Sequence, residues 1–300
     1  MVARTVVSRD GTSIVVFDVE PAERGAAKRG AAKSGAAKRG AANRATDKRH
    51  GAERPPLILV HGTASDHTTW RVAGPRLAAS RRAMAIDRRG RGASGDGRAY
   101  AIEREYEDVA AVATSLAEEA GGPVDVVGHS YGGRVALGAA LASDAIRRVV
   151  AYEGAPVHVR RGRVAHAFLD RLAGDLAAGR PDRMLDRFLR AEVGFRAAAL
   201  KAYHANPVWP DRVAAAGRTL LRELEAETSA AAGLARLGTV RQPVLLILGS
   251  ESPAFFRHGT ERLAHQLADV AVVEIAGAAH AAHHTHTAEF VAAVEAFLDR

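Results

Sequence analysis

Cysteine is absent from the 300-residue chain, and this absence excludes several kinds of site. Without cysteine there can be no disulfide, no thiolate metal site and no cysteine nucleophile. Long apolar runs are missing as well, since no stretch reaches the roughly 18 residues that a membrane span requires. Met1 to Thr5 also lacks the apolar run of a secretory signal. These absences favour a cytoplasmic protein with no membrane segment.

Positive charge is not spread over the chain. The formal net charge is +8, and all of it falls between Arg24 and Arg54, where ten Lys and Arg face two acidic residues. From Gly25 to Arg44 a Gly-Ala-Ala pattern repeats every five residues, a period that leaves a helix without an apolar face. We interpret residues 23–54 as a disordered, low-complexity basic insert. A contact with nucleic acid or another polyanion is the alternative, although no aromatic side chain is present there to stack on bases.

Short apolar runs alternate with helical patterns along much of the chain. Such runs are typical of strands buried on both faces of a parallel sheet, and they cover residues 56–60, 82–86, 124–127, 147–152, 244–248 and 270–275. Before them, Asp10-Gly11 predicts a hairpin turn. The pattern predicts an α/β fold: a mostly parallel, doubly wound sheet of about eight strands with helices on both faces. A site is expected where the strands end.

Residues 156–240 interrupt this alternation. They contain four amphipathic patterns, at 164–178, 182–192, 195–204 and 211–228, and five aromatic residues. We interpret this segment as a helical lid inserted into a core formed by residues 1–155 and 241–300. Its aromatic side chains either pack against one another or roof a substrate pocket.

A candidate nucleophile, Ser130, lies in Gly128-His129-Ser130-Tyr131-Gly132. An apolar run ends directly before this motif, and a helical pattern follows it. A serine at such a strand-turn-helix junction takes up a strained backbone conformation that lifts its hydroxyl above the sheet. The next backbone N–H then lies at a helix N-terminus, where it can stabilise an oxyanion. The alternative is an inert turn serine.

These motifs resemble the α/β-hydrolase superfamily. The resemblance covers the N-terminal hairpin and residues 55–300 apart from the lid, and it rests on His61-Gly62, on Asp87 to Ser94, on the Ser130 motif and on Gly277 to His280. A serine nucleophile points to the esterase and haloperoxidase-like branch, and away from the haloalkane dehalogenases and epoxide hydrolases. The resemblance implies an oxyanion hole made by the backbone N–H groups of Thr63 and Tyr131.

The general base is expected just after the last strand, at His280. There it could take the serine proton and return it to the leaving group. His284 is the next candidate, and His283 and His286 are further competitors. We expect no metal site, because these histidines lack a carboxylate ligand at helical spacing, and we expect no cofactor.

The triad acid has two candidates. In α/β-hydrolases the chain order is serine, acid, histidine, and the resemblance places the acid in the loop after residues 244–248, which favours Glu251. Relatives usually carry the acid one residue later, where this chain has Ser252, and the longer glutamate side chain could offset that shift. The alternative acid is Glu153, after the preceding apolar run.

The predicted activity is therefore that of a serine hydrolase, which cleaves a small carboxylic ester through an acyl-enzyme. A C–C bond hydrolase, a lactonase and a cofactor-free perhydrolase share the same machinery. A non-catalytic binding protein is the alternative from another class. The expected partner is a small, partly apolar substrate, and the sequence indicates no oligomeric state.

Overall fold

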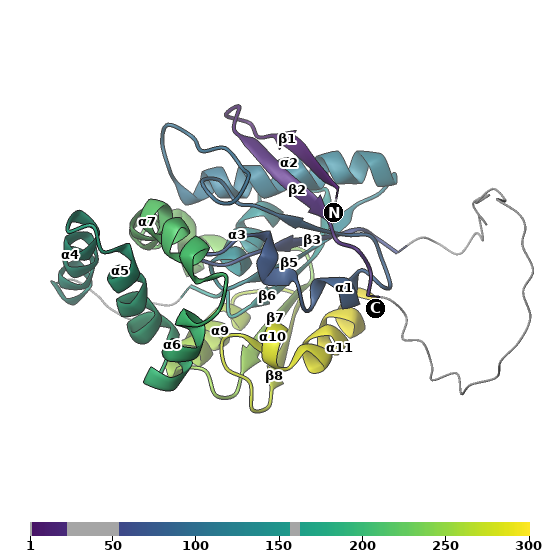
Figure 1. Ribbon diagram of the computed structural model, residues 1–300. Helices are drawn as coiled ribbons and strands as arrows, with labels where there is room; N and C mark the ends of the chain where they lie inside the picture. Colours follow the sequence, from purple (N-terminus) through teal and green to yellow (C-terminus); the bar gives the residue numbers. More distant parts are fainter. Residues whose placement is uncertain (1, 23–53, 157–162) are drawn as a thin grey trace, which may run out of the picture.

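The computed structural model describes residues 2–22, 54–156 and 163–300, with the side chains of residues 163–165 left aside. The predicted basic insert thus lies, apart from Arg54, outside the described residues. Eight strands form one sheet in the order β1-β2-β4-β3-β5-β6-β7-β8, and helices surround it (Figure 1). The five pairings from β4 through β3 to β8 are parallel, whereas β2 pairs antiparallel with both β1 and β4. The predicted fold class is confirmed.

The strands lie where the apolar runs predicted them. Their bounds are β1 Ala3–Val7, β2 Ser13–Asp18, β3 Leu57–Val60, β4 Ala83–Ile86, β5 Val124–His129, β6 Ile146–Tyr152, β7 Val244–Gly249 and β8 Val270–Ile275. The predicted hairpin turn lies between β1 and β2, where Gly11 has a positive φ of 85°. A glycine tolerates this left-handed conformation without a steric penalty.

Helices occupy the connections between the strands. Those outside the predicted lid are η1 His67–Trp70, α1 Gly74–Leu77, α2 Ile102–Ala120, α3 Tyr131–Ala140, α9 Ala254–Ala264, α10 Ala282–Thr285 and α11 Thr287–Leu298. The helix α9 follows β7 directly and was not among the sequence-based expectations.

Two apolar layers cover the two faces of the sheet. On β3, Ile58 and Val60 belong to the layer that includes α2 and α3, and Leu57 and Leu59 belong to the layer that includes α1 and α11. This alternation follows from the two-residue period of a strand. Trp70 is 1% exposed and packs in the second layer.

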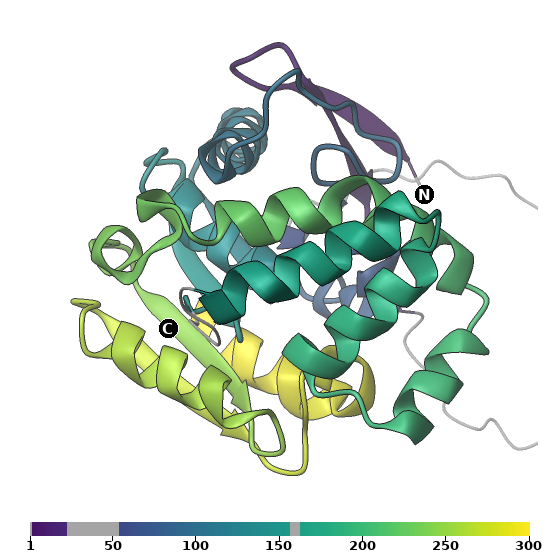
Figure 2. The ribbon, with the colours of Figure 1, turned by 90° about the vertical axis from the view of Figure 1, so that its left-hand side faces the viewer.

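The described part of the segment between β6 and β7 contains helices joined by short loops, and no strand. It contains α4 Arg163–Ala177, α5 Pro181–Phe188, the π-helical η2 Leu189–Val193, α6 Ala197–His204, α7 Trp209–Ala226, η3 Ala230–Ala232 and α8 Leu234–Leu237. Helices α4 to α7 gather on one side of the sheet (Figure 2). They share an apolar cluster of their own, which includes Phe168, Leu185, Phe188 and Leu220. Within the residues that the structure describes, no helix is long and apolar enough to cross a membrane.

Candidate active site

Ser130 occupies the sharp turn between β5 and α3. Its φ and ψ are 55° and −126°, a conformation that costs a non-glycine residue free energy and is concentrated at functional sites. The turn is possible only with glycine on both sides. A Cβ on Gly128 would lie 2.2 Å from the Gly132 carbonyl oxygen, and one on Gly132 would lie 2.3 Å from the His61 carbonyl oxygen. The chain segments therefore meet closely around the serine.

Glu153 and His280 are brought together beside this turn. Glu153 follows β6, the strand next to β5, and is 3% exposed. One of its carboxylate oxygens forms a short hydrogen bond with His280 Nδ1, and the other accepts the Gly249 N–H at 2.8 Å. The carboxylate thus fixes Nδ1 as the protonated nitrogen, which leaves Nε2 as a hydrogen-bond acceptor.

Glu251 lies elsewhere. It follows β7, its side chain is exposed, and its carboxylate forms no hydrogen bond or ion pair with any described residue. Its backbone N–H donates to the Ala278 carbonyl at 2.8 Å, so the turn after β7 is held through the main chain. The structure therefore joins His280 to Glu153, the alternative acid of the sequence analysis, and leaves the favoured Glu251 apart.

Backbone strain marks the same places. The non-glycine residues with positive φ in the described part of the chain are Ala64, Ser130 and Glu153, at 49°, 55° and 48°. Ala64 lies in the loop after β3, next to the predicted oxyanion residue Thr63. The three positions come from three different loops at the ends of neighbouring parallel strands, so the strain is confined to one edge of the sheet.

The loop that carries His280 is held beside the Ser130 turn by several side chains. His129 Nε2 donates to the His280 carbonyl oxygen at 2.7 Å. The Tyr152 hydroxyl donates to the Ala279 carbonyl and accepts the Ala282 N–H at 2.9 Å. Phe256 of α9 stacks on the His280 ring, with centroids 4.5 Å apart. Sequence reasoning singled out none of these supporting side chains.

The Ser130 hydroxyl itself forms no hydrogen bond with a described residue, His280 included. Hydrogen bonds between catalytic groups are often long in the absence of substrate and tighten in the complex. The neighbouring ring of His129 lies 4.6 Å from the His280 ring, centroid to centroid. The His280 ring is thus adjacent to the turn that carries Ser130.

Two backbone donors are available for an oxyanion. Neither the Thr63 N–H nor the Tyr131 N–H donates to another group in the residues described. The Thr63 loop touches the serine turn, since a Cβ on Gly62 would lie 3.1 Å from Ser130 Cβ. The Tyr131 N–H is the first of the ten-residue helix α3, where the helix dipole adds to its attraction for negative charge.

His61 shapes the Thr63 loop. Its Nδ1 donates to the Gly62 carbonyl at 2.8 Å, and its Nε2 accepts the Arg88 N–H at 3.1 Å. Burial and then the nearby Arg88 charge hold the pKa of His61 well below its usual range. The ring is therefore neutral, and its two hydrogen bonds give it a structural role.

A buried charge network lies behind Tyr131. Arg88 and Arg91 form ion pairs with Glu105 of α2 and with Glu223 of α7, and all four side chains are at most 1% exposed. Arg88 also lies over the Tyr131 ring, 4.6 Å from its centroid. Two positive charges thus meet two negative charges, which is the condition for burying them. The family loop at Asp87 to Ser94 supplies both arginines.

The other histidines after β8 take different positions. His283 is buried, and its ring lies 4.3 Å from that of His129 and 5.4 Å from that of Trp70. Burial holds the pKa of His283 well below its usual range and lowers that of His284 to about 4. Among the described residues, no group of three His, Asp or Glu side chains could hold a metal ion.

Comparison with known proteins agrees with this architecture. The model of the alpha/beta hydrolase family matches residues 57–294. One curated relative, the dihydrolipoyllysine-residue acetyltransferase component of the acetoin cleaving system of Pseudomonas putida, is 36% identical over 87 residues. That match covers 28% of this chain and only 22% of the relative's length.

Solved structures match over nearly the whole chain. An alpha/beta hydrolase from Sphaerobacter thermophilus is 27% identical with a TM-score of 0.71, covering 97% of this chain and 100% of the other. The enol-lactonase from Burkholderia xenovorans is 19% identical with a TM-score of 0.70, covering 99% and 100%. The esterase RhEst1 from a Rhodococcus species is 22% identical with a TM-score of 0.66, covering 100% and 99%.

The family model spans far more than half of the chain and includes the serine turn, the Glu153 loop and His280. The chain therefore belongs to the alpha/beta hydrolase family.

Proposed function

We propose that the protein is a serine hydrolase that cleaves a small carboxylic ester through an acyl-enzyme. Ser130 is the nucleophile, His280 the general base and Glu153 the acid that orients it. The backbone N–H groups of Thr63 and Tyr131 form the oxyanion hole. The observation that carries this proposal is the hydrogen bond between His280 Nδ1 and the buried Glu153 carboxylate, next to a strained serine.

The reaction proceeds in two steps, acylation of Ser130 and hydrolysis of the acyl-enzyme. His280 Nε2 takes the Ser130 proton as Oγ attacks the ester carbonyl, and the carbonyl electrons move onto the oxygen in the oxyanion hole. When the intermediate collapses, the alcohol leaves with that proton and the acyl group stays on Ser130. Water then attacks the acyl-enzyme, with His280 again as base, and releases the carboxylic acid.

A lactone is the second candidate substrate. It is a cyclic ester, so the same two steps open it, and the alcohol and the acid remain in one product molecule. The fold similarity to an enol-lactonase favours including this class. The two classes differ in pocket shape and not in the triad.

We also propose that helices α4 to α7 act as the lid of this site, over a core of residues 1–155 and 241–300. Ala64, beside the oxyanion residue Thr63, belongs to the apolar cluster of these helices. Several aromatic residues of the segment pack on one another, with Tyr203 edge-on to both Phe195 and Trp209. A lid of this kind excludes water and favours apolar acyl or alkoxy groups.

The test combines labelling with kinetics. We expect a fluorophosphonate to label the wild-type chain at Ser130 and to leave Ser130→Ala unlabelled. With p-nitrophenyl esters and a lactone panel, Glu153→Gln should lower kcat by about 10²–10⁴-fold, as loss of the orienting carboxylate does in serine triads. Glu251→Gln is the matched control and should stay near wild type.

Two results would count against the proposal. An unlabelled wild-type chain would remove the nucleophile assignment. A large loss of activity in Glu251→Gln together with a normal Glu153→Gln would transfer the acid to the loop after β7.

A further inference from the structure

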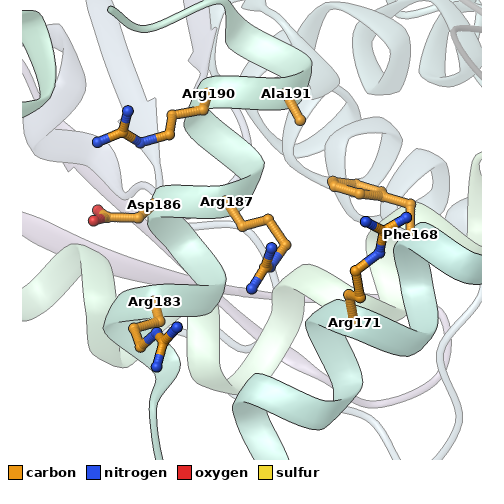
Figure 3. A pocket seen from close by; sticks show the side chains of 7 residues that line it. All are labelled: Phe168, Arg171, Arg183, Asp186, Arg187, Arg190 and Ala191. Atoms are coloured by element: carbon orange, nitrogen blue, oxygen red, sulfur yellow. The ribbon is translucent and has the colours of Figure 1, made fainter. Parts of the chain in front are cut away.

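A cavity lies in the helical segment, away from the proposed triad. It has a volume of about 460 Å³ and is bordered by α4, α5 and η2. Its lining includes four arginines, Arg171, Arg183, Arg187 and Arg190, together with Asp186 and Phe168 (Figure 3). None of Ser130, Glu153 and His280 lines it, so it is separate from the ester site.

Two of these guanidinium groups are held through their Nε atoms alone. Arg187 Nε donates to Asp175 at 2.9 Å, and Arg171 Nε donates to the Ala167 carbonyl at 3.0 Å. The Nη atoms of both arginines donate to no described residue. Both side chains extend into the space between α4 and α5 (Figure 3). Each guanidinium therefore presents Nη–H donors that have no partner among the described residues, and the two come from opposite walls of the cavity.

Asp175 holds the Arg187 side chain in place beside the cavity. It lies on α4 and is 5% exposed. Its hydrogen bond with Arg187 lowers the pKa of this carboxyl group, which keeps it ionised at neutral pH. Because Asp175 orients the Arg187 side chain from behind, the guanidinium is already positioned before any ligand arrives.

Positive charge in the cavity is only partly compensated, because Asp175 pairs with Arg187 alone among the lining arginines. Arg183 and Arg187 lie four residues apart on one helix, where like charges repel. Neither Arg183 nor Arg190 forms an ion pair in the described part of the chain. The acidic lining residue, Asp186, is engaged by His204 Nε2 at 2.7 Å. An anion bound in the cavity would reduce the repulsion between these arginine side chains.

We propose that this cavity binds a phosphate monoester, with the phosphate between Arg171 and Arg187. Guanidinium groups bind phosphate oxygens through paired N–H donors. The excess of arginine over carboxylate favours a dianion over a carboxylate monoanion. Phe168, which is 8% exposed, offers an apolar wall for the organic group. The volume falls within the range of small-molecule sites, and the π-helical turn η2 beside it is of a kind frequent at functional sites.

The test uses phenyl phosphate as the probe and isothermal titration of the full-length chain at low ionic strength. We expect one site per chain, weakened by added salt because the contacts are ionic. Benzoate, with one charge on the same ring, should bind more weakly. Arg171→Gln should weaken phenyl phosphate binding by about tenfold or more, the effect of losing a charged hydrogen bond.

Matched variants distinguish binding in this cavity from binding elsewhere on the chain. Arg171 is exposed, so its replacement should leave the melting temperature unchanged. Arg187→Lys keeps the positive charge but loses the paired N–H donors of the guanidinium, so this variant should also bind phenyl phosphate more weakly. Arg196→Gln, an exposed position on the same segment, and deletion of residues 25–44 should leave binding intact.

The proposal is overturned if phenyl phosphate does not bind the wild-type chain, or if Arg171→Gln binds it equally well. Equal affinity for benzoate and phenyl phosphate would overturn the preference for a doubly charged phosphate. Loss of binding on deletion of residues 25–44 would assign the anion to the basic insert instead.

Discussion

Two side chains hold the loop of His280, and each directly precedes another residue of the proposed triad. His129 comes before Ser130, and Tyr152 comes before Glu153. Between them they bond to the main chain at residues 279, 280 and 282. The strand ends that present the nucleophile and the acid thus also fix the position of the base.

Tyr152→Phe tests this positioning. The variant keeps the ring but loses the bonds to the Ala279 carbonyl and the Ala282 N–H. We expect kcat for a p-nitrophenyl ester to fall by about tenfold, the loss that a small misplacement of a catalytic group can cause, with KM nearly unchanged. Tyr106→Phe is the control, because its hydroxyl bonds to the Ala231 carbonyl at 3.1 Å, outside the site. Equal kcat values for the two variants would contradict the positioning role.

A buried neutral histidine predicts how stability depends on pH. Burial lowers the pKa of His283 below its unfolded value near 6.5. The unfolded chain therefore binds more protons than the folded chain below that pH, so stability falls as the pH is lowered from 6.5 toward 5. One such histidine contributes at most about 1.4 kcal/mol per pH unit.

His283→Gln should flatten this dependence, because glutamine does not titrate. Urea unfolding at a series of pH values between 5 and 7 measures the slope. The control is His258→Gln at an exposed position, which should leave the slope unchanged. Parallel curves for wild type and His283→Gln would show that His283 does not carry the effect.

Among the elements, α7 connects the helical segment to the core through charge. Glu223 pairs with Arg88 and Arg91, Arg212 pairs with Asp66 at 3.1 Å, and α7 therefore bonds to the loops after both β3 and β4. Since Arg88 also covers the Tyr131 ring, α7 and the proposed oxyanion residue Tyr131 share one buried network. This helix is the fixed part of the proposed lid.

Glu223→Gln should destabilise the protein strongly. It leaves two buried arginines with a single carboxylate partner, and breaking a buried ion pair by removing one partner costs about 3–5 kcal/mol. Chemical denaturation measures the loss of free energy of unfolding. Glu225→Gln, an exposed position on the same helix, should change it by less than about 0.5 kcal/mol. If Glu223→Gln also changed the free energy of unfolding by less than about 0.5 kcal/mol, the buried ion pairs would not stabilise the fold.

For the molecule as a whole, the net positive charge and the proposed catalytic residues lie in different parts of the chain. The excess of +8 falls between Arg24 and Arg54, and the proposed triad lies in the formally neutral remainder. The chain is attached to the core at both ends of the basic insert. Before the insert, the Ala22 N–H donates to the Pro75 carbonyl, and at its last residue Arg54 pairs with Asp299.

Deletion of residues 25–44 should therefore leave ester hydrolysis and the melting temperature near wild type. It removes most of the basic residues of the insert, so the chain should elute from a cation exchanger at clearly lower salt. Activity assays, thermal melts and ion-exchange elution measure the three effects. A collapse of activity on deletion would show that the insert contributes to the site.

The sheet and the serine turn were predictable from sequence because each depends on local pattern. A continuous apolar run predicts a buried parallel strand, and glycines around Ser130 predict a sharp turn. The acid was not predictable in the same way. β6 and β7 both lead into a glutamate, and the choice between Glu153 and Glu251 depends on which side chain turns toward His280. That direction is set by the positive φ at Glu153 and by its bond to Gly249.

The supporting side chains were missed for a related reason. His129 and Tyr152 are ordinary strand residues in sequence, and their partners lie more than 120 positions away. Only the register of β5 and β6 brings them beside the loop after β8.

The left-handed conformations of Ala64, Ser130 and Glu153 have a consequence for how such a chain would evolve. Glycine at any of the three would relieve strain on the order of 1 kcal/mol, yet glycine at two of them would remove a triad side chain. Selection for folding alone thus favours losing the proposed machinery, and selection for turnover has to oppose it continuously. A lineage released from that second pressure would be expected to drift first at these loops, while the sheet beneath them persisted.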